Sequence, residues 1–340
     1  MRWNVLIPDR LAPPADVEAA VFGDRADLVL CEATAADQID DATWAAADAV
    51  LAWHELRFTP EVIARLVNCR VIVRVGVGYD NVDLSAAAAA GIPVCNVPDY
   101  GTGDVADHAM ALLLSLARGV TAASNRLRTG NEHHHWHVAG RQKRLAGATL
   151  GIIGLGRIGT AVALRAKAFG LRVVFHDPYL PDGMDKALGV ERCATRQELL
   201  ARSDFVSIHT PLTDETRGLG DAAFFAALKP GAILVNTARG AIVDLDALHA
   251  ALKSGHLKAA GVDVLPVEPP DRTHPLLRDW SDDAEWLGDR LVVTPHFAFW
   301  CDEAYAEMRR KAAETALAVL EGGEVRNRVD PGTPALARIP

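Results

Sequence analysis

The chain has 340 residues, half of them hydrophobic, and carries a formal net charge of −9 at pH 7. This length and composition predict a globular protein of about two domains. The negative charge argues against nucleic acid or an acidic membrane surface as the main partner. An anionic ligand would need arginines gathered at one place.

The five cysteines are scattered and include no CxxC pair. This pattern favours free thiols in a reducing cytoplasm over a disulfide framework. The N-terminal residues, MRWNVLIPDR, begin a strand-like run without a signal-peptide core, and no apolar run of about 18 residues follows. We therefore expect a cytoplasmic protein without a membrane segment.

Strand-like and helix-like segments alternate along the first hundred residues. The strand-like runs are WNVLIP, DLVL, AVLAW, RVIVRV and IPVCNV, with alanine-rich helical stretches at 60–66 and 83–90. This alternation predicts an α/β fold with a mostly parallel sheet. The glycine pair in RVGVGYDNVD, residues 74–83, lacks the third glycine of a dinucleotide site. We interpret it as a turn that exposes backbone N–H groups beside Arg74, with a plain strand-to-helix turn as the alternative.

A long helical pattern runs from about Asp104 to Arg128. The polar stretch that follows, residues 129–147, includes His133, His134, His135 and His137. We favour a solvated loop over a metal site there, because no cysteine or acid cage accompanies these histidines.

A second alternating series begins near Ala148. Its segments are TLGIIG, a helix at 157–169, RVVFHD, FVSIHT, AILVNT, AAGVDV and RLVVTPH, followed by an amphipathic helix at about 303–321 and a short polar tail. The two series predict two doubly wound, Rossmann-like domains with parallel sheets. One large open sheet is the alternative.

Gly154, Gly156 and Gly159 form a GxGxxG motif between a hydrophobic strand and an alanine-rich helix. That context is the one a dinucleotide-binding turn requires, because the helix N-terminus then offers N–H groups to phosphates. Asp177 ends the next strand, 18 residues after the last glycine. A carboxylate there accepts both hydroxyls of the adenosine ribose and repels a 2′-phosphate, which favours NAD over NADP.

Polar residues follow the strands of the second series at the end where ligands of open α/β sheets bind. The stretches are His209-Thr210-Pro211, Asn236-Thr237-Ala238-Arg239, Asp263 and Thr294-Pro295-His296, and Glu268 follows shortly after Asp263. An arginine, a glutamate and a histidine together suggest a charge clamp, an orienting carboxylate and a group that titrates near neutral pH.

Several stretches resemble the NAD-dependent D-isomer-specific 2-hydroxyacid dehydrogenases. They are GIIGLGRIGTAVALRAKAFG, VNTARGAIVD, GVDVLPVEPP and TPH, with RVGVGYDNVD, PVCNVPDYGTGDVADHAMALLL and FHDPYLPDG extending the match over nearly the whole chain. The wording of some stretches is especially similar to the C-terminal-binding-protein corepressors, which share this fold.

The resemblance implies a substrate domain of residues 1–98 plus 298–340 and a dinucleotide-binding domain of residues 99–297. The active site is expected in the cleft between the domains, and residues 104–146 at a homodimer interface. The implied ligands are NAD and a small 2-oxo or 2-hydroxy acid, with neither nucleic acid nor membrane as a partner and no metal.

The resemblance also implies residue roles. Arg239 would bind the substrate carboxylate, His296 would exchange a proton with the substrate oxygen, and Glu268 would orient His296. The implied substrate-binding residues are Arg74, Val75, Gly76, Arg239, His296 and Phe299. The implied cofactor-binding residues are Gly154, Gly156, Arg157, Ile158, Gly159, Asp177, Thr210, Pro211, Thr216, Thr237, Ala238, Arg239, Asp263 and His296.

Two functions remain open at this point: a reductase of small 2-oxo acids, which we favour, and a dinucleotide-sensing scaffold like the corepressors with residual dehydrogenase activity. The bulky FAFW stretch after His296 departs from the small residues that the family often has there. Substrate size is therefore open as well.

Overall fold

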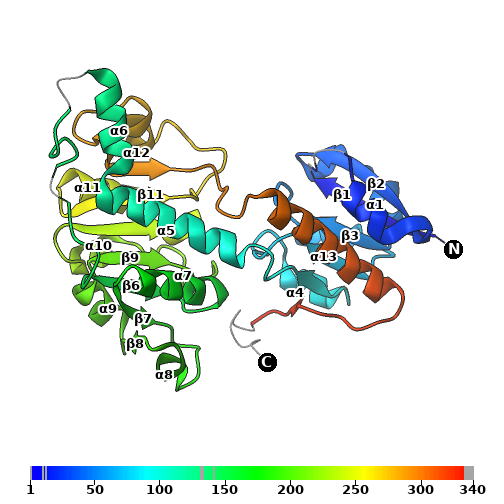
Figure 1. Ribbon diagram of the computed structural model, residues 1–340. Helices are drawn as coiled ribbons and strands as arrows, with labels where there is room; N and C mark the ends of the chain where they lie inside the picture. Colours follow the sequence, from blue (N-terminus) through cyan, green and yellow to red (C-terminus); the bar gives the residue numbers. More distant parts are fainter. Residues whose placement is uncertain (1, 10, 12–13, 131–133, 141, 333–340) are drawn as a thin grey trace. The chain divides into compact units, whose positions relative to one another are not determined.

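The computed structural model describes residues 2–9, 11, 14–130, 134–140 and 142–332 (Figure 1). The chain divides into two units, each with its own sheet: Met1–Gly101 with Trp300–Pro340, and Thr102–Phe299. The predicted α/β class with two Rossmann-like, mostly parallel sheets is confirmed. The assignment of substrate and cofactor roles to residues 1–98 plus 298–340 and to 99–297 stays a prediction.

The first unit contains a six-stranded sheet in the order β13-β5-β4-β3-β1-β2. The strands are β1 (Trp3–Asp9), β2 (Ala26–Ala33), β3 (Ala49–Ala52), β4 (Val71–Arg74), β5 (Val94–Asn96) and β13 (Arg328–Val329). The helices are α1 (Asp16–Phe22), α2 (Asp41–Ala46), α3 (Pro60–Ala64), α4 (Leu84–Ala89) and α13 (Asp302–Leu320). Strands β3 and β4 are buried along their whole length, as continuous apolar runs in a parallel sheet should be.

The polar tail after the last helix contributes β13, which the sequence does not predict. This strand has two residues and pairs antiparallel with β5 through Arg328 and Val329. Its side-chain pattern is too short to carry a period-2 signal, and the strand forms because β5 offers a free sheet edge.

The second unit contains a seven-stranded, all-parallel sheet in the order β12-β11-β10-β9-β6-β7-β8. The strands are β6 (Thr149–Ile153), β7 (Arg172–His176), β8 (Glu191–Arg192), β9 (Phe205–Ile208), β10 (Ala232–Asn236), β11 (Leu257–Val262) and β12 (Leu291–Val293). The helices are α5 (Thr102–Arg118), α6 (Val120–Thr129), α7 (Arg157–Ala168), α8 (Met184–Leu188), α9 (Arg196–Arg202), α10 (Ala222–Ala227), α11 (Leu245–Lys253) and α12 (Pro275–Ser281).

Apolar cores cover both faces of this sheet. Side chains of α5 and α7 pack on one face, and those of α9, α10, α11 and α12 pack on the other. The strand order reverses between β6 and β9, so the connections after these two strands leave the sheet in opposite directions. Ligands in doubly wound folds bind at this switch point, outside the carboxyl ends of the strands.

The single helix predicted over 104–128 is wrong, because two helices occupy that stretch. Gly119 separates α5 from α6 with a left-handed backbone, φ 63° and ψ 32°. Glycine adopts this conformation without the steric cost that a side chain would bring. The helical period continues on both sides of the break, and for this reason the hydrophobic pattern did not reveal it.

Among the described residues, none of the helices is long and apolar enough to cross a membrane.

Candidate active site

The glycine motif forms the turn from β6 into α7. Gly154 has φ 87°, and Gly156 precedes the first residue of the helix. A Cβ atom on Gly159 would lie 2.1 Å from the carbonyl oxygen of Gly154, so the helix packs directly on the turn only because position 159 is glycine. The first N–H groups of α7 have no partner within the helix, as in every α-helix, and are available to a phosphate.

Asp177 lies next to this turn at the carboxyl end of β7. Its side chain is buried, and its two oxygens accept hydrogen bonds from the backbone N–H groups of Leu155 (2.9 Å) and Tyr179 (3.0 Å). Each carboxylate oxygen has a second lone pair free for a further donor. The carboxylate is therefore fixed beside the glycine turn, where the predicted ribose role requires it.

Two threonine hydroxyls near the switch point are buried without a partner in the described structure. They are Oγ1 of Thr210, after β9, and Oγ1 of Thr237, after β10. A buried hydroxyl without a hydrogen bond is costly, so each of them fits a site that a polar ligand completes. Thr216 differs, because its hydroxyl donates to Pro211 O (2.6 Å) and accepts from Thr213 N (2.8 Å). Its predicted role in cofactor binding stays a prediction.

The turn that carries Arg239 is shaped by Asn236, the last residue of β10. The Asn236 side chain donates to Arg239 O (3.0 Å) and accepts from Ala238 N (3.0 Å), which folds the chain back at the strand end. A Cβ atom on Gly240 would lie 1.9 Å from the carbonyl carbon of Leu265. Glycine at position 240 therefore lets this turn lie against the loop that follows β11.

That second loop carries Glu268, which pairs with His296. The distance between His296 Nδ1 and Glu268 Oε2 is 2.7 Å, and Leu265 N donates to Glu268 Oε1 (2.8 Å). Burial alone would raise the pKa of Glu268, but the hydrogen bond and charge of His296, the Leu265 N–H and the charge of Arg239 together lower it. Glu268 is therefore an acceptor, and His296 donates to it from Nδ1.

Asp263 holds the loop on which His296 lies. Its buried carboxylate accepts from the Thr294 hydroxyl (2.6 Å), Phe297 N (3.0 Å) and Ala298 N (3.0 Å). Its carbonyl accepts from His296 N (2.7 Å). These contacts keep His296 at φ 53°, a left-handed conformation that is uncommon outside glycine. The sequence predicted a cofactor contact for Asp263 and gave no sign of this positioning role.

Two further histidines near the site are neutral at physiological pH. Burial lowers the pKa of His209, at the end of β9, to about 3. Burial also lowers the pKa of His108, on α5, and the charge of Asp263 offsets only part of that effect. His108 Nε2 lies 3.0 Å from the Thr294 hydroxyl, a contact that the helical pattern of α5 could not reveal. His296 is the histidine whose geometry suits proton exchange.

The large aromatic residues after His296 include Phe297 and Trp300, whose rings lie close to other rings. The Phe297 ring meets the His108 ring edge to face, with centroids 5.3 Å apart. The Trp300 ring lies against Tyr305 of α13, with centroids 4.9 Å apart. Phe299 is half-buried, and its predicted role as a pocket wall stays a prediction.

The substrate-binding residues predicted in the first unit lie at the end of β4. Arg74 is buried and donates to the Val75 carbonyl, and its charge acts on the buried carboxylate of Asp9. Val75 N donates to Ala52 O (2.8 Å) and Gly76 N to Arg74 O (2.9 Å). Their binding of a substrate carboxylate stays a prediction.

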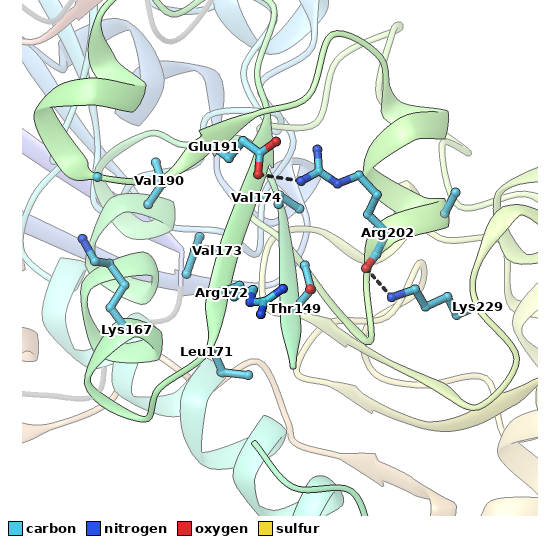
Figure 2. A pocket seen from close by; sticks show the side chains of 12 residues that line it. Thr149, Lys167, Leu171, Arg172, Val173, Val174, Val190, Glu191, Arg202 and Lys229 are labelled. Atoms are coloured by element: carbon cyan, nitrogen blue, oxygen red, sulfur yellow. Dashed lines mark hydrogen bonds and ion pairs between the residues drawn. The ribbon is translucent and has the colours of Figure 1, made fainter. Parts of the chain in front are cut away.

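A cavity of about 680 Å³ lies at the other end of the second sheet, where Thr149 begins β6 and Arg172 begins β7 (Figure 2). Lys229 donates to Arg202 O (2.5 Å), and Arg202 bonds Glu191 (2.6 Å). Because this cavity lies at the amino ends of the strands, away from the glycine turn, we do not assign it to catalysis.

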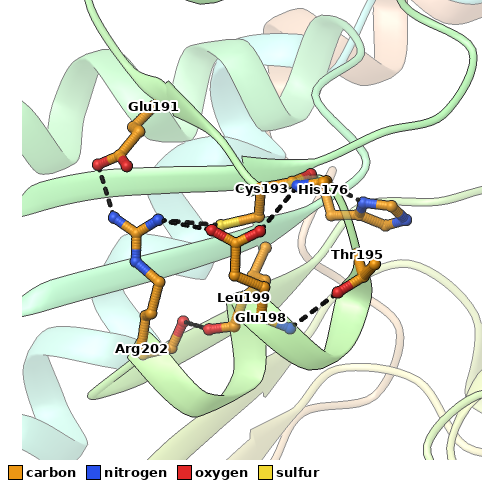
Figure 3. Close-up of polar contacts among 9 residues, drawn as sticks. His176, Glu191, Cys193, Thr195, Glu198, Leu199 and Arg202 are labelled. Atoms are coloured by element: carbon orange, nitrogen blue, oxygen red, sulfur yellow. Dashed lines mark hydrogen bonds and ion pairs between the residues drawn. The ribbon is translucent and has the colours of Figure 1, made fainter.

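The corner beside this cavity joins β7, β8 and α9 (Figure 3). Arg202 lies between Glu191 and Glu198 (3.0 Å), and the buried Cys193 Sγ is 3.6 Å from the guanidinium. Burial, as the largest effect, raises the pKa of Cys193, so this thiol is not an activated nucleophile. The corner anchors the edge of the sheet.

Residues 134–140 and the other described parts of the chain contain no group of three or more side chains suited to holding a metal ion. His133 lies outside the described residues.

Residues 110–298 match the family model described as "D-isomer specific 2-hydroxyacid dehydrogenase, NAD binding domain". The chain belongs to this family. The matched segment includes the glycine turn, Asp177, Arg239, Glu268 and His296.

Curated and solved members of the family cover nearly the whole chain. It is 38% identical over 328 residues to the D-3-phosphoglycerate dehydrogenases of Mycobacterium bovis and Mycobacterium tuberculosis, covering 96% of this chain and 59% of the relatives. The D-lactate dehydrogenase of Aquifex aeolicus, solved with NAD and lactic acid, is 25% identical with a TM-score of 0.82, covering 97% of this chain and 100% of the other. The D-mandelate dehydrogenase of Rhodotorula graminis is 28% identical with a TM-score of 0.83, covering 98% and 99%.

The mycobacterial relatives differ from this chain in length, and the three kinds of relative differ from one another in the hydroxy acid that their names give. The chain spans about 59% of the length of the mycobacterial relatives. The names of the three kinds of relative refer to three different hydroxy acids, so family membership leaves the substrate open. The likeness to the corepressors stays a prediction.

Proposed function

We propose that this protein is an NAD-dependent D-2-hydroxyacid dehydrogenase that reduces a small 2-oxo acid to the D-2-hydroxy acid. The observation that carries the proposal is the 2.7 Å pair between His296 Nδ1 and Glu268 Oε2, beside a turn that presents Arg239. The pair is a histidine oriented by a carboxylate, the arrangement of a general acid and base. The guanidinium supplies a permanent positive charge for an oxo acid.

Three residues of the chain have separate roles in the proposed reduction. Arg239 binds the carboxylate of the 2-oxo acid and draws electron density toward its carbonyl oxygen. NADH, held by the glycine turn and Asp177, would supply the hydride to C2. His296 donates the Nε2 proton to the carbonyl oxygen, and Glu268 stabilises the imidazolium before the transfer. The products are the 2-hydroxy acid and NAD, and the reverse reaction returns the proton to His296.

The residues around the glycine turn fit a dinucleotide. The α7 N-terminus suits the pyrophosphate, and the Asp177 carboxylate suits the ribose hydroxyls. The buried hydroxyls of Thr210 and Thr237 are polar groups that a ligand would satisfy. NAD is the preferred form in this proposal, because the Asp177 carboxylate would repel a 2′-phosphate.

The direct test is steady-state oxidation of NADH by the purified full chain with a panel of 2-oxo acids. The proposal requires turnover with at least one of them and a D-configured product. Binding of NADH without turnover of any 2-oxo acid would instead favour a dinucleotide-sensing scaffold, the alternative function that the sequence leaves open. Among the described residues, no contact or surface specifically favours a scaffold.

Replacing Glu268 with glutamine should move the pH–rate profile of reduction to lower pH. The pKa of Glu268 is lowered, so its carboxylate stays ionised as the pH falls and holds the proton on His296. Glutamine keeps the shape but removes the negative charge that stabilises the imidazolium form of the proposed acid. The measurement is kcat/KM against pH for both proteins. An unchanged profile would contradict the role of Glu268, and Glu285→Gln, on an exposed acid of the same unit, is the matched control.

Replacing Phe299 with alanine should reduce activity on apolar 2-oxo acids more than activity on glyoxylate, which has no side chain. Phe299 lies three residues after His296, and each methylene it buries is worth about 0.8 kcal/mol. We therefore propose that phenylpyruvate or a branched 2-oxo acid is preferred over oxaloacetate, which carries a second charge. The D-mandelate dehydrogenase supports an aromatic substrate in this family. Equal losses on phenylpyruvate and glyoxylate would show that Phe299 is structural.

We also propose a cytoplasmic homodimer joined through α5, α6 and the arm that follows. Large apolar side chains are exposed there: Trp136 is 95% exposed, Val120 61% and Leu127 44%. A second copy of the chain would cover them. A solution mass of two chains by light scattering would support the proposal.

A further inference from the structure

A hydrogen bond joins two loops that follow neighbouring parts of the second sheet. The Tyr179 hydroxyl donates to Glu215 Oε2. Tyr179 belongs to the loop after β7, and Glu215 belongs to the loop after β9, close to Thr210 and Pro211. These strands flank β6 and the glycine turn, so the contact bridges the place where the adenosine half of a dinucleotide would lie.

Tyr179 also connects this contact to the ribose acid. Its N–H donates to Asp177 Oδ1 (3.0 Å) and its hydroxyl reaches Glu215, while the residue as a whole is 48% exposed. The hydrogen bond to Glu215 is the largest cause of a raised pKa of Tyr179, with burial and the charges of Glu215 and Asp177 adding to it. The tyrosine therefore stays protonated and holds two carboxylates on one side of the site.

Backbone carbonyls of this loop hold the side chain of Arg192. Arg192 donates to the carbonyls of Asp177 (3.0 Å), Leu180 (3.2 Å) and Pro181 (2.9 Å). Its ring neighbour is Phe175, 4.9 Å from the guanidinium carbon. A 2′-phosphate would have to compete with these three acceptors for Arg192, while meeting the charges of Asp177 and Glu215.

We propose that Glu215 is a second residue that selects NAD over NADP, and that Tyr179 is the positioning residue that keeps its carboxylate over the adenosine site. The inference rests on the proposed use of NAD by this chain. Asp177 would recognise the ribose hydroxyls, and Glu215 would repel the 2′-phosphate through charge alone.

The charge of Glu215 should change the affinity for NADPH by a factor that can be measured. A unit charge several ångströms from a phosphate in a water-rich site changes its affinity by about three- to tenfold. Glu215 is exposed, so salt should screen its effect at about 1 M ionic strength, where the Debye length is near 3 Å. A hydrogen bond to the ribose would lack that salt dependence and would act on both cofactors.

The experiment measures the dissociation constants of NADH and NADPH for the full chain by cofactor fluorescence, at low and high salt. Glu215→Gln should strengthen NADPH binding by about three- to tenfold at low salt and leave NADH within about twofold, with the difference lost at high salt. Tyr179→Phe keeps the charge of Glu215 but removes the hydrogen bond that positions it. NADPH binding should therefore strengthen by a smaller factor than in Glu215→Gln. Asp214→Asn removes the neighbouring exposed charge and is the matched control.

The outcomes separate this inference from the proposed function. Equal changes for the two cofactors in Glu215→Gln, or the same selectivity change in Asp214→Asn, would overturn the role of Glu215 and leave the NAD site standing. Failure of the wild-type chain to bind either cofactor would overturn the proposed function and this inference with it.

Discussion

Replacing His296 with alanine is expected to lower kcat for 2-oxo acid reduction by about 10²–10⁴-fold, the usual range for a lost general acid. The 2.7 Å contact to Glu268 occupies Nδ1, and Nε2 is the proposed proton donor. Without the imidazole, water would have to protonate the carbonyl oxygen. The KM for NADH should change little, because the contacts of the glycine turn and Asp177 do not involve this side chain.

A second variant is needed at position 296 because alanine does not suit the backbone conformation there. Its φ of 53° is left-handed, a region in which alanine is strained and asparagine is several-fold enriched. His296→Asn removes the acid while keeping a residue suited to that backbone. Loss of kcat in both variants, with unchanged thermal stability in His296→Asn, would assign the effect to proton transfer. Turnover near that of the wild type in His296→Asn would exclude His296 as the acid.

Most of the architecture was predictable because its signals are local in the chain. Apolar runs identified most of the strands, and GxGxxG between a strand and a helix identified the turn at Gly154. Polar residues directly after buried strands made Arg239 and His296 candidates for the site, since parallel strands bring their carboxyl ends to one edge. None of these signals depends on which distant segments of the chain are in contact.

The features that escaped prediction depend on contacts between distant segments or on single backbone angles. The break at Gly119 leaves the hydrophobic period intact, and β13 is too short to show one. The bond between Tyr179 and Glu215 joins residues 36 apart, and nothing in either stretch indicates the other. Asp263 was predicted at the right strand end, but its contacts with residues 31 to 35 positions later were not.

The Asp263 contacts show how the fold fixes His296. The carboxylate is 1% exposed and accepts from the Thr294 hydroxyl, Phe297 N and Ala298 N, on both sides of His296. Asp263 thus ties the histidine loop to the end of β11, while Glu268, five residues later in the same connection, orients the imidazole. One connection therefore sets both the position and the orientation of the proposed acid.

Replacing Asp263 with alanine should consequently lower both stability and kcat. It leaves one hydroxyl and two N–H groups of the buried loop without an acceptor, at about 1–3 kcal/mol for each group that water cannot reach. A misplacement of His296 by about 1 Å would lower kcat by about 10²-fold. Asp263→Asn is the matched variant, because it keeps the shape and one acceptor oxygen and should lose less of both quantities.

Three measurements on these variants distinguish positioning from direct cofactor contact: the melting temperature, kcat, and the dissociation constant of NADH. A positioning role predicts that the melting temperature and kcat fall together in the order wild type, Asp263→Asn, Asp263→Ala, with NADH affinity within about threefold. That tolerance is under 1 kcal/mol, less than the 1.5–3 kcal/mol of a hydrogen bond to a charged group. Thr294→Val, which removes one of the three donors, should reproduce part of the fall in kcat. If NADH affinity instead falls by much more than threefold while the melting temperature is unchanged, Asp263 acts on the cofactor. Another group must then hold His296 in its left-handed conformation.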